Sequence, residues 1–154
     1  MGEWFAVRTR AGTEGKVLIG IQAAHMQAFL PVELIRMNHR GNHIQDRAVM
    51  WRPLFPGTLF AMLDPARDIP KLRELDGVDD LVRPNGRLVP VADEVIRAIR
   101  RAERDGLFDL AAGCRMPDDG ASPPDVRFAN LMMKIKRARW SKARTALLME
   151  LLAR

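Results

Sequence analysis

Strand-like and helix-like runs alternate through the first two thirds of the chain, and glycine or proline stands at many of the junctions. Aromatic and β-branched residues at 4–9 predict a first strand. Thr13 followed by Glu14 predicts the start of a helix that ends near residues 25–26. Further strands are expected at 28–36, where Pro31 favours an edge or a bulge, and at 44–51 after a polar hairpin tip. Another is expected within 52–63, where two prolines and a glycine precede an apolar strand.

The second part of this alternation predicts a helix capped by Asp68, strands at 78–82 and 88–91 around a Pro-Asn-Gly turn, and a helix from Asp93 that ends at Gly106. With the strand residues of 44–63 counted once and those of 78–91 counted once, the order is β-α-β-β-α-β-α. Helices of this length on an antiparallel sheet indicate an α+β fold, a two-layer domain of the ferredoxin-like type. We assign this domain to residues 1–106.

The remaining residues differ in composition from this domain. Glycines, prolines and acidic residues at 107–125 predict a linker, with Leu107, Phe108 and Leu110 fastening its start to the domain. Residues 126–154 contain neither glycine nor proline, and their net charge is +7 against −1 for residues 1–125. Their composition favours a helical pair at about 127–139 and 142–153, the second with a leucine stripe at Leu147, Leu148, Leu151 and Leu152.

Several classes of protein are not supported by these residues. No apolar run is long enough for a membrane span, and no secretory signal is visible, so we expect a cytoplasmic protein that does not bind membranes. A lone cysteine, Cys114, forms no internal disulfide, and His39 and His43 lack a third metal ligand. Glycine-rich phosphate loops and paired catalytic residues are absent from the sequence. We therefore expect no enzyme activity, cofactor, metal or small-molecule substrate.

The strongest local motif is Pro53-Leu54-Phe55-Pro56-Gly57-Thr58-Leu59-Phe60. Two prolines and a glycine can hold a Leu-Phe pair in a fixed, extended bulge at the surface. The alternative is a strand bend whose aromatic side chains are buried.

Taken in order, these segments resemble the N-terminal domain of the NusG family of transcription elongation factors, particularly its RfaH-like antiterminators. The matching pieces cover about residues 4–104: Trp4-Phe5-Ala6-Val7-Arg8-Thr9-Arg10, Ala11-Gly12-Thr13-Glu14-Gly15-Lys16, Phe29-Leu30-Pro31-Val32-Glu33, the Pro53 to Phe60 motif, Asp64-Pro65, Asp76-Gly77-Val78 and Pro90-Val91-Ala92-Asp93-Glu94-Val95-Ile96. The resemblance implies the same α+β fold and a factor that binds RNA polymerase and suppresses pausing or termination.

The resemblance also implies the contact residues. An apolar patch would bind the clamp helices of the largest polymerase subunit, and its matching residues are Trp4, Phe5, Leu54, Phe55, Thr58 and Phe60. The start of the second helix would face the gate loop of the second-largest subunit through Arg67, Asp68, Ile69 and Pro70. Upstream non-template DNA would lie near Arg8, Arg10 and Lys16, on one face with the start of the first helix.

Two features depart from the family pattern. Thr58 stands where the family usually has tyrosine after Pro-Gly, and the β-barrel KOW domain that normally follows is not recognisable. The basic C-terminal segment remains to be explained. Its charge suits a polyanion, with Lys134, Lys136, Arg137 and Arg139 as candidate nucleic-acid contacts. The alternative function is thus a nucleic-acid-binding module that acts through this segment.

The leucine stripe of the C-terminal segment must be buried somewhere. In RfaH-like proteins a helical hairpin covers the clamp-binding patch, and the Leu54-Phe55 pair is an available partner here. Three other possibilities stay open: a dimer-forming helix, a free basic arm and a remnant of the β-barrel.

Overall fold

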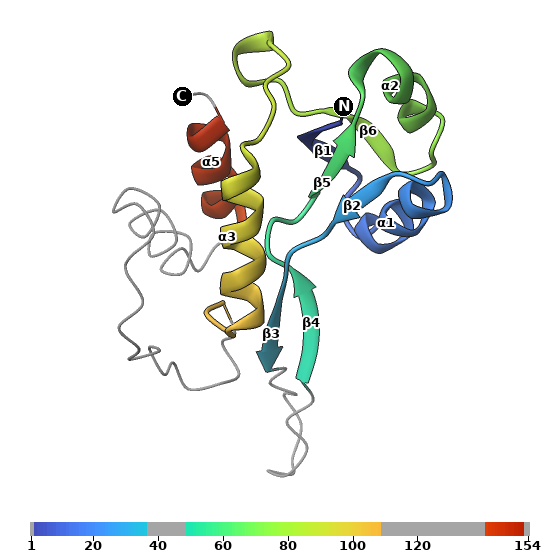
Figure 1. The fold of residues 1–154 in the computed structure, drawn as a ribbon. Coiled ribbons are helices and arrows are strands. Elements are labelled where there is room, and N and C mark those ends of the chain that lie inside the picture. Colours follow the sequence, from blue (N-terminus) through green and yellow to red (C-terminus); the bar gives the residue numbers. More distant parts are fainter. Residues whose placement is uncertain (1, 37–48, 109–140, 153–154) are drawn as a thin grey trace.

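The computed structural model describes residues 2–36, 49–108 and 141–152 (Figure 1). Its elements, in chain order, are β1 (Glu3–Thr9), α1 (Glu14–Ala23), β2 (Gln27–Phe29), β3 (Val32–Arg36), β4 (Val49–Pro53), β5 (Thr58–Leu63), α2 (Pro65–Arg73), β6 (Val78–Leu81), the 3₁₀ turn η1 (Pro84–Gly86), α3 (Asp93–Arg104) and α5 (Ser141–Leu152).

Four strands form an antiparallel sheet in the order β2-β5-β1-β6, with β1 and β5 at its centre. Strands β3 and β4 pair only with each other and make a separate two-stranded ribbon. The expected run at 28–36 is therefore divided at Pro31, since proline cannot donate to a strand ladder. The predicted α+β class with an antiparallel sheet is confirmed.

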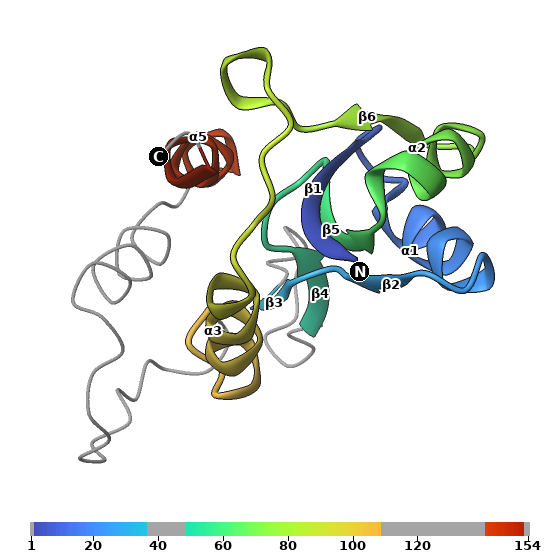
Figure 2. The ribbon, with the colours of Figure 1, turned by 45° about the horizontal axis from the view of Figure 1, so that its top comes forward.

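Helices cover both faces of the sheet because side chains of β1 alternate between two cores. Phe5 and Val7 belong to a core shared with α1 and α2, whereas Trp4 and Ala6 belong to a core shared with α3 and α5. Figure 2 shows α1 and α2 on one side of β1 and β5, with α3 and α5 on the other. The sequence predicted a two-layer domain and did not distinguish the helices; in the structure α1 and α2 cover one face of the sheet, and α3 and α5 cover the other.

The start of α2 differs from the prediction. Asp64, not Asp68, is the N-cap, and its Oδ1 accepts the N–H of Ala66 at 3.2 Å. Asp68 lies inside the helix and accepts the Asp64 N–H at 2.9 Å. Pro65 at the first helical position suits this earlier start, because proline lacks the N–H that is unpaired there.

The predicted strand at 88–91 is wrong. Val82 and Val91 do not pair with each other across the turn at η1; each donates its N–H to β1, to Ala6 at 2.8 Å and to Trp4 at 2.6 Å. The chain thus follows β1 in two places and loops out between them, which leaves Val91 as an isolated bridge.

The third helix and its end follow the prediction. Ile96, Ile99 and Ala102 of α3 are buried, and Gly106 has a φ of +70°, the conformation that favours glycine after a helix. Phe108 is buried and Leu107 packs beside it, whereas Leu110 lies outside the described residues. The second tail helix is present as α5; the expected first one, at 127–139, also lies outside them.

Candidate functional site

The Pro-Gly motif places Leu54, Phe55 and Phe60 in the core beneath α3 and α5, whereas Leu59 belongs to the core under α1 and α2. Phe55, Pro56, Gly57 and Thr58 form a turn in which the Thr58 N–H donates to the Phe55 carbonyl at 3.0 Å and Gly57 has a φ of +76°. The Gly57 N–H in turn donates to the buried carboxylate of Glu14 at 2.8 Å. This fixed turn directs Leu54 and Phe55 inward, as the strand-bend interpretation of the motif predicts.

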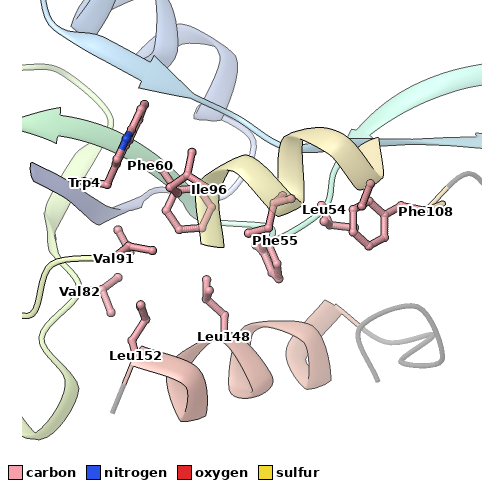
Figure 3. Close-up of a cluster of buried hydrophobic side chains, with 13 residues drawn as sticks. Trp4, Leu54, Phe55, Phe60, Val82, Val91, Ile96, Phe108, Leu148 and Leu152 are labelled. Carbon is pink, nitrogen blue, oxygen red and sulfur yellow. The ribbon is translucent and has the colours of Figure 1, made fainter. Parts of the chain in front are cut away.

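We call the apolar side chains that meet there the covered cluster (Figure 3). Its base consists of Leu54, Phe55, Phe60, Val82 and Val91, and its cover consists of Ile96 and Ile99 from α3 with Leu148 and Leu152 from α5. The rings of Phe55 and Phe60 meet edge to face at a centroid distance of 6.2 Å. Leu147 of the predicted leucine stripe packs against the same cluster.

Trp4 contacts α3 in two ways. Its indole Nε1 donates to Asp93 at 3.2 Å, and the Arg100 guanidinium lies 5.2 Å from its ring centroid. The same guanidinium lies 4.8 Å from the ring centroid of Phe29. These contacts hold α3 against the sheet through a cation between two aromatic faces.

All six predicted clamp-binding residues are buried, Phe55 completely. Leu54, Phe55 and Phe60 lie under α5 and α3, Trp4 lies under α3, and Thr58 lies beside Arg8 in the sheet register. Phe5 alone faces the opposite core with α1 and α2, where release of α5 does not expose it.

A buried ion pair joins α5 to the β3–β4 ribbon. Arg144 Nη1 lies 2.5 Å from Oε1 of Glu33, and both side chains are almost fully buried. Arg52, opposite Glu33 in the ribbon, donates to the same oxygen from Nε at 2.8 Å. Among the described residues, Glu33 Oε2 has no hydrogen-bond partner. Removing one member of a buried pair costs far more than a surface pair contributes, so this contact strongly restricts where α5 can dock.

This pair was not predicted from the sequence. The signal was available, since Arg144 stands four residues before Leu148 and eight before Leu152, on the same helical face. A charged residue on an apolar stripe indicates a buried partner, but nothing in the sequence designates Glu33.

The predicted gate-loop residues lie at the first half of α2 with different exposures. Arg67 and Pro70 are exposed, Ile69 packs at the edge of the core under α1 and α2, and Asp68 is buried. Hydrogen bonds from Arg67 and from the Asp64 N–H lower the pKa of Asp68. Asp68 therefore holds the helix start together, and only its neighbours are accessible to a partner.

Two of the three predicted DNA-contacting cations of the domain meet. Arg10 and Lys16 both pair with the exposed carboxylate of Asp76, Lys16 at 2.5 Å, and together they lower the pKa of Asp76, Lys16 more strongly. Arg8 is exposed but follows Trp4 and Ala6 in the strand alternation, which places it on the other face of the sheet from α1. The four tail residues Lys134, Lys136, Arg137 and Arg139 lie outside the described residues.

The described part of the chain has neither a cluster of metal ligands nor a membrane-spanning helix. It contains no group of three or more His, Cys, Asp or Glu side chains placed to hold a metal ion. Nor does any of its helices have the length and apolar character of a membrane span.

Comparison with known proteins identifies the family. Residues 2–100 match the family described as "Transcription termination factor nusG". A solved structure concerning domain interaction in Thermotoga maritima NusG is similar over 68% of this chain and 58% of that chain, at 25% identity and a TM-score of 0.46. A comparison with curated proteins found no match. Because the family match spans well over half of its residues, the chain belongs to the NusG family of transcription factors.

Proposed function

We propose that this protein is a transcription elongation or antitermination factor that binds RNA polymerase in the cytoplasm through the surface beneath α5. One observation carries the proposal: α5 covers Leu54, Phe55 and Phe60, the residues that the family resemblance assigns to the clamp helices. These side chains are apolar and belong to one cluster, and a polymerase coiled coil could replace one covering helix with another.

Masking by α5 is the second part of the proposal. The helix follows the family-matched region at a distance of 40 residues, so it can leave the sheet without breaking a strand ladder. Burial of Leu148 and of Leu152 contributes about 1.5–3 kcal/mol each, and the Arg144–Glu33 pair adds to the specificity of docking. A cover of this strength is reversible when a partner offers an equal apolar area.

The remaining contacts complete the proposed complex. The gate loop would be contacted by Arg67, Ile69 and Pro70. A factor that bridges the clamp and the gate loop would favour a closed clamp and so suppress pausing. Arg10 and Lys16, with Arg8 on the other face, would lie towards upstream non-template DNA. A phosphate there would have to compete with the carboxylate of Asp76, which now pairs with both Arg10 and Lys16.

Capture of core RNA polymerase by the immobilised full chain tests the proposal. Leu148→Ala should increase capture because it weakens the cover without altering the covered surface, whereas Ala146→Gln at an exposed position of α5 should not. If neither the original chain nor Leu148→Ala captures polymerase, polymerase binding is refuted. Nucleic-acid binding that disappears with residues 126–154, in a chain that captures no polymerase, would support the alternative function.

A further inference from the structure

Trp51 is unusually exposed for a tryptophan. Among the described residues, only Ile19 and Trp51 are large hydrophobic side chains in exposed positions, at 68% and 60% of their full accessible surface. Ile19 stands alone on α1, and an isolated exposed aliphatic residue is ordinary. An exposed indole is less common, because tryptophan offers more apolar surface than any other side chain.

The strand register fixes the direction in which Trp51 points. Leu34 lies directly opposite Trp51, and Val32 lies opposite Pro53, so these four side chains share one face of the ribbon. Glu33 and Arg52 occupy the other face, where Glu33 contacts Arg144 of α5. Trp51 therefore faces away from α5 and away from the covered cluster.

The ribbon is held firmly at its base. The Leu54 N–H donates to the Pro31 carbonyl at 2.8 Å, and the Val32 N–H donates to the Glu103 carboxylate of α3 at 3.3 Å. Figure 1 shows β3 and β4 extending beyond the four-stranded sheet. The indole is thus presented on a projecting, anchored support, which is favourable for binding because little order is lost when a ligand stacks.

Size and charge select the kind of ligand. The accessible area of one indole and three smaller, half-buried neighbours is far below the roughly 800 Å² per partner of a stable protein interface. A single planar group is the right size for it. Behind this face, the one carboxylate of Glu33 meets two arginines, which leaves an excess positive charge, and Arg52 is partly exposed. Both the flat aromatic surface and the charge suit a nucleobase attached to a phosphate chain.

We propose that Trp51 is a stacking platform for an unpaired base of single-stranded nucleic acid. This contact is separate from the surface beneath α5 and from Arg10 and Lys16, and it does not depend on polymerase binding. A base in a duplex already stacks on its neighbours, so the platform distinguishes single strands from double strands.

Binding of labelled oligonucleotides to the full chain, followed by fluorescence anisotropy, tests this inference. Trp51→Ala should weaken binding of oligo-dT or oligo-U about 5- to 100-fold, the range expected for loss of one stacked base, and Trp51→Phe should retain most of the affinity. Ile19→Ala is the matched control and should bind as the original chain does. Because stacking releases no counterions, Trp51→Ala should leave the salt dependence unchanged.

The arms of the experiment separate the possible sources. A larger effect on oligo-U than on oligo-dT would indicate RNA, the reverse would indicate DNA, and duplex DNA should bind all variants equally. The inference is overturned if the chain binds no single strand, or if Trp51→Ala and Ile19→Ala bind alike. It is also overturned if Trp51→Ala impairs polymerase capture but not oligonucleotide binding, because Trp51 would then be a protein contact. Unchanged thermal melting will establish that each variant is folded.

Discussion

Leu148→Ala should release α5 from the sheet while the rest of the domain stays folded. Leu148 is almost completely buried against Phe55 and its neighbours, and truncation of a buried leucine to alanine costs about 2–5 kcal/mol. Even the lower value reduces the ratio of docked to undocked helix about 25-fold. The second core, with Phe5, Val17 and Leu59, contains no α5 residue and should keep its stability.

Native-state hydrogen exchange measures this directly. The protected amides of α5 should exchange about 25-fold faster or more in Leu148→Ala, whereas amides of β1 and β5 should change little. Ala146→Gln is the control, since Ala146 is exposed on the same helix. Equal acceleration in α5 and in the sheet would refute the reasoning, because it would mean that the helix and the domain unfold together. Unchanged exchange in α5 would show that Leu148 does not hold it.

Three further predictions concern the domain itself. Phe55→Ala should lower the free energy of unfolding by about 3–5 kcal/mol in urea, and a negligible change would mean that the ring is not a core residue. Gly77→Ala should lower the free energy of unfolding more than Gly86→Ala does in the same assay. Both glycines have positive φ, but an added Cβ at Gly77 would lie 2.8 Å from Thr13 Oγ1, whereas Gly86 has open space around it. Equal losses of stability would exclude the contact with Thr13 as the cause. Because the pKa of Asp68 is lowered in the folded state, its contribution to stability is complete above the usual aspartate pKa near 4 and is lost as pH falls through the lower folded-state pKa. Asp68→Asn should therefore reduce the loss of unfolding free energy that the original chain shows as pH falls through this range.

Local patterns predicted much of this fold. The strand at β1, the helices α1 and α3, and the glycine after α3 follow from side-chain periodicity and backbone preference, which act over a few residues. The start of α2 was misjudged because two aspartates four residues apart can each cap a helix. The strand predicted at 88–91 failed because its β-like residues pair with β1, a choice that depends on the whole sheet.

The candidate site was less predictable for the same reason. Leucines in the tail indicated a helix face that must be buried, and the motif at 53–60 indicated an apolar pair. The contact between the two joins residues about 90 positions apart in the sequence, which no local pattern specifies. The Arg144–Glu33 pair spans 111 residues and has no local signature at Glu33. The two faces of β1 were likewise not distinguished, so Phe5 was grouped with Trp4 although they enter different cores.

The affinity of the chain for core RNA polymerase, measured with and without residues 126–154, tests the central claim most directly. If α5 masks the polymerase-binding surface, removal of these residues should strengthen binding, and the exposed Leu54, Phe55 and Phe60 should then bind a hydrophobic dye. Weaker binding after truncation would contradict the account and make the basic segment a direct contact.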